Sequence, residues 1–246
     1  MPKNWALPLC VEQYGVRFRI TELDGCAVED IAGLFLPCLV EDGPKFYDIP
    51  EIRFRPHENT FDILAILASL YVRHGLFPMH ASGIVMQEQG ILCVGPSGTG
   101  KSSFARAALA AGLKIVGDDV VLLRCKEGKI ELLPWIYSIQ EKTEIKQPLF
   151  LDPGLFASGV LKAVLFSKIG AASQSSFSRI HASRSLPRLS LQLLWSFNFQ
   201  EALLQGDLVK QLLTFPSISV LFGKDILKQP DEFFTQLNRA LLLAHP

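Results

Sequence analysis

The 246-residue sequence has no surplus charge, no long apolar run and no amino-terminal leader pattern. Its 24 lysines and arginines balance 24 aspartates and glutamates, so nothing favours a general nucleic-acid or anionic-membrane surface. The longest apolar region, residues 61–72, is too short to cross a bilayer and contains Asp62 and Ser69. The first residues lack the charged-then-apolar pattern of a signal peptide. These absences predict a cytoplasmic protein that binds neither nucleic acid nor membrane.

A cysteine framework is also missing. Five cysteines lie at scattered positions and form no C-x-x-C pair (Cys10, Cys26, Cys38, Cys93 and Cys125). An odd, scattered set fits reduced thiols better than disulfides or a zinc site. We interpret Cys93 and Cys125 as small core residues of predicted strands. With 49% apolar residues, the chain can bury a sizeable core, as one large domain or one domain with an appendage.

The stretch that stands out is residues 95–102, Gly-Pro-Ser-Gly-Thr-Gly-Lys-Ser. It satisfies the phosphate-loop pattern G-x-x-x-x-G-K-[ST] at every fixed position. The apolar run 90–94 before it predicts a strand, and the alanine-rich run 102–111 after it predicts a helix that Gly112 would end. A phosphate site requires strand, glycine loop and helix in this order. We therefore favour it over a glycine-rich turn with a chance lysine.

The loop glycines allow the backbone to turn successive amide N–H groups inward, and the following helix adds the positive end of its dipole. Lys101 should reach the β- and γ-phosphates, and the Ser102 hydroxyl should bind Mg²⁺. The residues predicted to bind ATP are Gly95, Pro96, Ser97, Gly98, Thr99, Gly100, Lys101, Ser102 and Ser103.

A second functional signal is the pair Asp118 and Asp119, inside the apolar region 113–124 that we expect to be a strand. Carboxylates between apolar flanks are costly unless they are paired or bind a metal. We favour a metal or acid–base role over the other interpretation, a surface turn at Gly117-Asp-Asp.

The amino-terminal part, residues 1–75, is predicted to be a β-rich segment followed by a buried helix over 60–74. It could be a small β lobe, a substrate-recognition surface or an oligomer contact. Residues 76–246 are predicted to form the catalytic domain. In it, a strand over 76–86 should form a hairpin with the strand that enters the phosphate loop.

Farther along, residues 126–129 predict a hairpin turn, and residues 189–204 and 231–244 predict helices, the second capped by Asp231. Residues 171–190 are polar and serine-rich and include Arg179, Arg184 and Arg188. They predict either a mobile lid near an anionic substrate or a plain surface loop.

Three features now coincide: His80 lies 15 residues before Gly95, the phosphate loop is complete, and Asp118 follows Lys101 by 17 residues. This spacing, "HAS…GPSGTGKSS…GDD", resembles the catalytic core of the HPr kinase/phosphorylase family. The resemblance covers residues 76–125. It implies a P-loop kinase core of α/β class, related to the nucleotide-binding part of phosphoenolpyruvate carboxykinase, with a mixed β-sheet and flanking helices.

The resemblance implies an ATP- and Mg²⁺-dependent kinase that phosphorylates a serine hydroxyl. Lys101 would hold the phosphates, Ser102 and Asp118 would bind the metal, and Asp119 would be the general base. A carboxylate base suits this chemistry, because the hydroxyl must lose its proton as the bond to phosphorus forms. His80 would contact and orient the acid pair; otherwise it is a core histidine with satisfied hydrogen bonds.

An arginine often adds charge stabilisation in phosphoryl transfer. We select Arg184 as the catalytic candidate, with Arg179 and Arg188 as competitors.

One departure concerns the glycine-rich signature "LEIRGLG", which supplies an acidic metal ligand in true HPr kinases. Residues 135–140 read Trp-Ile-Tyr-Ser-Ile-Gln instead, and Glu141 or Glu144 are candidates for that ligand. The chain looks closer to shorter HPr-kinase-like proteins, some of which phosphorylate a serine of ribosomally made precursor peptides such as lasso peptides. This implies a peptide or small-protein acceptor rather than HPr itself. Family members often form trimers or hexamers, so a homo-oligomer is an open possibility.

Two other functions fit the same motifs. One is a nucleotide-binding switch or ATPase without an acceptor, which would need a positioned water rather than a base aimed at a hydroxyl. The other is a kinase for a free small-molecule hydroxyl, which would need a closed pocket rather than an open groove. A transporter ATPase is disfavoured, because no L-S-G-G-Q-like signature follows the loop.

Overall fold

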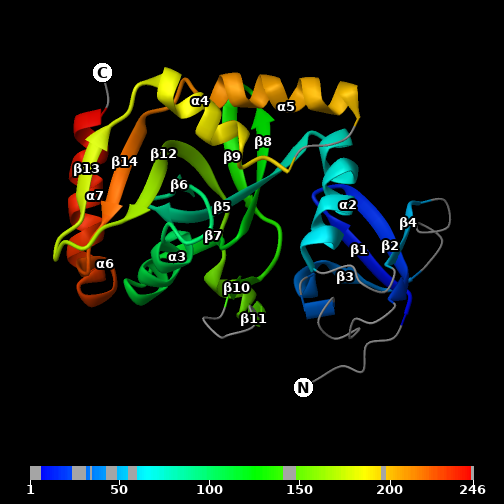
Figure 1. The fold of residues 1–246 in the computed structure, drawn as a ribbon. Helices are drawn as coiled ribbons and strands as arrows, with labels where there is room; N and C mark the ends of the chain where they lie inside the picture. The colour runs from blue at the N-terminus through cyan, green and yellow to red at the C-terminus, as the bar shows by residue number, and fades with distance from the viewer. Residues whose placement is uncertain are drawn as a thin grey trace.

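The computed structural model describes residues 7–23, 32–33, 35–42, 49–54, 60–140, 148–194 and 198–244. Its main feature is an eight-stranded mixed sheet with the order β13-β14-β12-β6-β5-β8-β9, in which β7 also pairs with β5 (Figure 1). The strands are β5 (Leu76–Met86), β6 (Gln89–Val94), β7 (Lys114–Gly117), β8 (Val120–Lys126), β9 (Lys129–Pro134), β12 (Gly159–Ile169), β13 (Ser176–Arg179) and β14 (Ser217–Phe222). The predicted α/β class with a mixed sheet is confirmed.

Helices cover both faces of this sheet. They are α3 (Lys101–Ala110), α4 (Ala182–Ser190), α5 (Phe199–Leu212), α6 (Asp225–Lys228) and α7 (Pro230–Ala244). On one face, α3, α6 and α7 share an apolar cluster that includes Phe104 and Leu165 of β12. On the other face, α4 and α5 pack in a cluster that includes Leu208 and Phe166, the next residue of β12. Neighbouring side chains of one strand thus point to opposite, equally buried faces.

The phosphate loop lies at one edge of this sheet because of the strand directions. Strands β6, β12 and β14 are parallel, so their carboxyl ends lie at the same edge. Residues 95–100 leave β6 at this edge and enter α3. The predicted hairpin before the loop is confirmed, since β5 and β6 are antiparallel and joined by a turn at Gln87 and Glu88. The predicted turn within 126–129 is confirmed as well, between β8 and β9.

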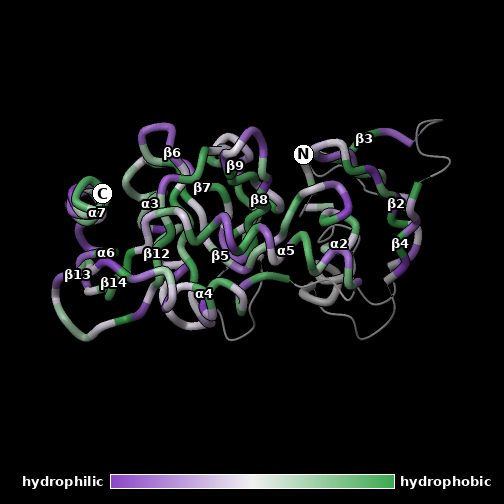
Figure 2. The backbone as a smooth tube through the Cα atoms, turned by 90° about the horizontal axis from the view of Figure 1, so that it is seen from above, coloured by the Kyte–Doolittle hydropathy of each residue, from purple (hydrophilic) through white to green (hydrophobic). Residues whose placement is uncertain are grey.

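A smaller sheet forms the other end of the molecule, far from β13 and α7 in both views (Figures 1 and 2). Its order is β3-β1-β2-β4, with strands Leu39–Val40 (β3), Leu9–Gln13 (β1), Val16–Leu23 (β2) and Glu51–Phe54 (β4). The expected buried helix is α2 (Thr60–Arg73). One apolar cluster joins Phe18 of this sheet and Tyr71 of α2 to Val120 and Leu133 of the large sheet. The packing is therefore continuous across the boundary predicted at residue 75.

Short elements complete the described chain: two 3₁₀ helices, η1 (Leu36–Cys38) and η3 (Pro153–Leu155), and a two-stranded sheet of β10 (Ser138–Gln140) and β11 (Pro148–Phe150). Within the described ranges, no helix combines the length and the apolar character that crossing a membrane requires.

The helix predicted over 189–204 is wrong. α4 ends at Ser190, and α5 begins at Phe199 after Asn198, whose side chain caps it. Between them the chain pairs with β5: the His80 amide donates to the Gln192 carbonyl at 2.6 Å, and the Leu194 amide donates to the Pro78 carbonyl at 3.2 Å. These sheet-like bonds to a distant segment override the local apolar pattern. Asp231 does not cap the last helix either, because α7 already begins at Pro230.

The region 171–190, predicted as a mobile lid or a plain surface loop, contains regular secondary structure. It forms β13 and α4, which pack against the large sheet. The region 113–124 is not one strand, since it divides into β7 and β8 with the acid pair between them. Cys93 and Cys125 lie in strands β6 and β8 as predicted, the first buried and the second half-buried.

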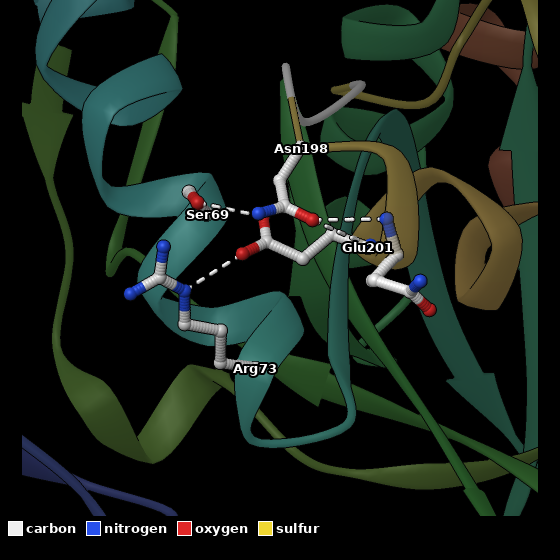
Figure 3. Close-up of polar contacts among 5 residues, drawn as sticks. Ser69, Arg73, Asn198 and Glu201 are labelled. Atoms are coloured by element: carbon white, nitrogen blue, oxygen red, sulfur yellow. Dashed lines mark hydrogen bonds and ion pairs between the residues drawn. The ribbon is translucent and has the colours of Figure 1, made fainter.

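A polar contact between α2 and α5 holds the amino-terminal part to the large sheet (Figure 3). The carboxylate of Glu201, which is only 4% exposed, accepts a hydrogen bond from the Ser69 hydroxyl at 2.6 Å. Its second oxygen accepts from Arg73 Nε at 2.7 Å. The Asn198 side chain accepts from the amides of Gln200 and Glu201, which fixes the start of α5 beside α2.

Replacing Glu201 should therefore destabilise the protein. We expect Glu201→Ala to lower the free energy of unfolding by about 1–3 kcal/mol, because a buried acceptor of two hydrogen bonds is lost. Asp207→Ala is the matched control on the same helix, since Asp207 forms an exposed ion pair with Lys210 and such pairs contribute little. Urea unfolding of both variants measures the difference. An equal decrease in the free energy of unfolding in both variants would contradict a structural role for the buried contact.

Candidate active site

The phosphate loop has the strained backbone that its glycines predict. Gly100 has φ +97°, in the region that side chains with a Cβ rarely adopt. A Cβ at this position would also lie 2.7 Å from the Phe222 ring at the end of β14. Phe222 in turn stacks on Phe104 of α3, with 6.1 Å between ring centroids. The loop therefore rests on an aromatic cluster, and only glycine fits where it touches that cluster.

Lys101 lies inside the curl of this loop. Its side chain is 6% exposed, and Nζ donates hydrogen bonds to the carbonyls of Gly95 at 2.7 Å and Pro96 at 3.1 Å. The Thr99 hydroxyl donates to the same Pro96 carbonyl at 2.8 Å and accepts from the Ser167 hydroxyl at 3.0 Å. The loop is thus held closed around an ammonium group. A site built in this way suits the negative charge of phosphates.

The acid pair lies where β7 turns into β8, beside the strand that carries His80. The pairing of β5 with β7 and β8 places residues 118 and 119 next to residues 80–83. Asp118 is 1% exposed and accepts a hydrogen bond from the Ser82 hydroxyl at 2.7 Å. Asp119 is about a quarter exposed, and its φ of +86° turns it away from the strand direction. The pair therefore has one buried member and one member open to solvent.

The strand register places the buried acid near the loop, because Asp118 accepts from Ser82, and Ser82 of β5 pairs with Cys93 of β6. Burial raises the pKa of the Cys93 thiol to about 12, and the charges of Lys101 and Asp118 act on that thiol in opposite directions. Cys93 lies on β6, two residues before the phosphate loop. Asp118 thus lies close to the carboxyl end of β6, and the Lys101 ammonium bonds the Gly95 carbonyl directly after this strand. This is the arrangement expected where a metal–phosphate complex binds.

His80 contacts the acid pair, as expected. Its Nδ1 lies 3.3 Å from Asp119 Oδ1, and both side chains are about a quarter exposed. The backbone of His80 is fixed on both sides, because its amide bonds Gln192 and the following Ala81 amide donates to the Asp119 carbonyl at 3.1 Å. The partial exposure does not fit a core histidine. A histidine in this position can orient the carboxylate of Asp119.

The donor set fits Mg²⁺ bound together with a nucleotide rather than a metal held by protein alone. The residues that the structure describes contain no group of three or more histidine, cysteine or acidic side chains suited to a metal ion. Asp118 and the half-buried Ser102, in the first turn of α3, are the two oxygen ligands predicted for the metal. Mg²⁺ usually takes only one or two protein ligands and completes its shell with phosphates and water. Glu141 and Glu144, the other candidates, lie outside the described residues.

The three candidate arginines lie close together in space. Arg179 at the end of β13 and Arg184 and Arg188 of α4 line one cavity of about 540 Å³. Arg188 also lines a second cavity, of about 200 Å³, beside Gly95 and Pro96 of the phosphate loop. Its guanidinium lies 5.7 Å from the centre of the Phe166 ring, which holds it between the two cavities. Arg188 therefore borders the phosphate loop, whereas Arg184 lines the outer cavity.

Several residues of the site were not predicted. Ser82 lies two positions after His80, so strand alternation places both side chains on one face and could have identified it. Ser167 and Lys168 at the end of β12 also line the cavity beside the loop, together with Gln192. Nothing local identifies these three, because β12 and the segment after α4 reach the loop only through the tertiary fold.

No protein-family model matches the sequence, and no curated protein matches it. Among solved structures, the chain is similar to the Hpr(Ser) kinase/phosphatase from Coxiella burnetii, with 13% sequence identity and a TM-score of 0.41. The alignment covers 67% of this chain and 98% of that one. A likeness at this level establishes neither the family nor the activity of this chain.

Proposed function

We propose that this protein is an ATP- and Mg²⁺-dependent kinase that transfers a phosphoryl group to a hydroxyl, most simply a serine of a peptide or small protein. The observation that carries the proposal is the acid pair at the phosphate loop. Asp118 is buried near the loop lysine, and Asp119 is open to solvent and contacts His80. The two acids thus differ in surroundings, as a metal ligand and a base should.

When bound, Mg-ATP supplies the transferable γ-phosphoryl group and the divalent charge that partly neutralises it. Lys101 and the loop amides would bind the phosphates, and Ser102 and Asp118 would bind the metal. The Ser82 hydroxyl keeps Asp118 in place through its hydrogen bond at 2.7 Å. Arg188, rather than Arg184, is placed to stabilise charge on the transferred group, because it lines the cavity beside the loop.

Asp119 acts as the general base. As the acceptor oxygen bonds to the γ-phosphorus and ADP leaves, the hydroxyl proton passes to a carboxylate oxygen of Asp119. His80 Nδ1 lies 3.3 Å from one carboxylate oxygen of Asp119, and the second oxygen can accept the proton from the acceptor hydroxyl. An ATPase or switch would require no acceptor groove beside this base. The cavity beside the loop and the arginine-lined cavity that shares Arg188 with it support transfer to an external hydroxyl.

The test is mass spectrometry of candidate acceptors after incubation with ATP and Mg²⁺. The candidates include peptides encoded beside this gene and free small-molecule alcohols. A gain of one phosphate on a serine, absent with Asp119→Asn, is the expected result. ATP hydrolysis without gain on any acceptor would instead identify an ATPase or switch. Gain on the free alcohols alone would identify a small-molecule kinase. The cytoplasmic location and a homo-oligomeric state remain predictions.

A further inference from the structure

Three cavities with shared lining residues extend from the phosphate loop to β13, and three arginines line the middle one. The cavity beside the loop and the arginine pocket (Ser178, Arg179, Ile180, His181, Ser183, Arg184, Arg188 and Ser219) share Arg188. A third cavity, of about 690 Å³, shares Arg179, Ile180 and His181 with the arginine pocket. It is bordered by Leu213, Phe215 and Pro216. In order from the loop, the cavities are thus lined by loop residues and Arg188, then by three arginines, and then by partly apolar residues.

The floor of the arginine pocket is one row of the large sheet. Phe166 of β12 pairs with Val94 of β6 and with Ser219 of β14, which pairs with Ser178 of β13. Residues paired in this way point to the same face, and Phe166 lies in the cluster under α4 and α5. Large apolar side chains fill this face near the phosphate loop, whereas the two small serines leave it hollow under α4. The pocket is therefore a product of the sheet register.

Among the residues that the structure describes, no acidic side chain lines the arginine pocket. The ion pairs between described residues do not involve Arg179, Arg184 or Arg188. Between Asp152 and Glu201 the chain has no acidic residue at all but carries five basic ones (Lys162, Lys168, Arg179, Arg184 and Arg188). Because the whole chain is neutral, with 24 residues of each sign, this surplus is local. Clustered guanidinium groups repel one another unless an anion binds between them.

We propose that the acceptor is an acidic peptide segment, whose carboxylates bind the arginine pocket while its serine reaches the phosphate loop. This inference rests on the proposed kinase function. Guanidinium forks bind carboxylates in bidentate geometry, and three of them on a recessed surface select a chain with several acids. The partly apolar third cavity accommodates apolar side chains next to those acids. Acceptor recognition is thus assigned to β13 and α4, at the opposite end from the small sheet (Figure 1).

An acidic peptide fits better than a nucleic acid. Single-stranded nucleic acid is bound by aromatic stacking platforms along a basic groove, and the arginine pocket is lined by serine, arginine, isoleucine and histidine. The basic region is also confined to one pocket of a neutral protein, rather than spread along a phosphate backbone.

Fluorescence anisotropy tests the proposal without requiring transfer. The probe is a short labelled peptide with one serine among aspartates and glutamates, and a matched peptide carries asparagines and glutamines instead. Both are titrated with the full chain, Mg²⁺ and a non-hydrolysable ATP analogue. We expect the acidic peptide to bind about tenfold or more tightly, with an affinity that falls as salt rises.

Double variants test whether the acidic peptide binds at the arginine pocket. Arg179→Ala/Arg184→Ala should weaken binding of the acidic peptide by about tenfold or more. Lys228→Ala/Arg239→Ala, which removes two exposed positive charges from α6 and α7, should leave it unchanged. Arg179→Glu/Arg184→Glu should reverse the preference toward a peptide with lysines around the serine. Thermal melting of each variant confirms that it is folded.

The outcomes separate this inference from the kinase proposal. Equal binding of acidic and neutral peptides, or acidic-peptide binding that survives Arg179→Ala/Arg184→Ala, would overturn it. So would tighter, arginine-dependent binding of a labelled oligonucleotide. If the acidic peptide binds in an arginine-dependent way but gains no phosphate, the kinase proposal is refuted. The proposal of an acidic-peptide site is then still supported. Phosphate gain on acidic and neutral peptides alike supports the kinase and refutes the selectivity.

Discussion

Lys101→Ala is expected to lower phosphoryl transfer by about 10³-fold, because it removes the one ammonium group inside the described phosphate loop. One preorganised donor to a developing negative charge contributes about 10²–10³-fold to a rate, and a full charge in a buried site contributes at the upper end. The Lys101 side chain is 6% exposed and bonds two loop carbonyls. Its loss should therefore weaken nucleotide binding as well. Calorimetric titration with Mg-ATP and a transfer assay measure the two effects.

The matched control is Lys129→Ala. Lys129 is exposed at the start of β9, next to the hairpin turn, so its removal subtracts the same charge without touching the phosphate loop. We expect its transfer rate to equal that of the unmodified protein. Melting curves for both variants check that the loss of two loop hydrogen bonds does not unfold the Lys101 variant. Full activity of a folded Lys101→Ala protein would show that the phosphate loop does not serve catalysis.

The sequence predicts well those parts of the fold whose determinants are local. The strand, glycine loop and helix around residues 90–112 are set by glycine conformations, alanine helix propensity and a positive φ of +71° at Gly112. The helix α2 and the hairpin of β5 and β6 follow from apolar pattern and turn residues. In each case the residues that determine the element lie within it.

The predictions from sequence fail where contacts between distant segments determine the backbone conformation. Residues 191–194 have an apolar helical pattern, but they pair with residues 78–80 of β5 and so cannot continue the helix. The Asp118–Asp119 pair divides an apolar run that reads as one strand, because Asp119 adopts a φ of +86°. That backbone state is uncommon for residues other than glycine, asparagine and aspartate. It is held by the bond from the Ala81 amide, more than thirty residues away in sequence.

The residues of the candidate site also fall into two groups: those that the sequence identifies and those that only the tertiary fold identifies. Lys101, Asp118 and Asp119 can be selected from the sequence because a motif or a buried charge marks them. The choice among three arginines cannot, since all lie in one basic stretch and only the packing of α4 on Phe166 brings Arg188 to the loop. Ser167 is found only from its bond to Thr99, which depends on the parallel pairing of β6 and β12.

Asp119→Asn should slow transfer by about 10²–10⁴-fold, the usual contribution of a general base, while Mg-ATP binding changes little. The substitution is nearly isosteric, and asparagine tolerates a positive φ as well as aspartate does, so the turn between β7 and β8 should persist. The asparagine side chain is neutral, so it cannot accept the proton that the substrate hydroxyl loses. Asp118→Asn should differ, because Asp118 is buried near the loop lysine and its loss should weaken binding of the metal–nucleotide complex.

Glu127→Gln provides the control for Asp119→Asn. Glu127 is an exposed carboxylate that also has a positive φ, of +52°, in the turn between β8 and β9. Its transfer rate should not change. Separate titrations of Mg-ATP binding and single-turnover transfer distinguish the roles of the two aspartates. If Asp119→Asn mainly loses nucleotide binding and Asp118→Asn mainly loses transfer, the two roles are reversed. Transfer at the normal rate in Asp119→Asn would mean that another group, or no group, takes the proton.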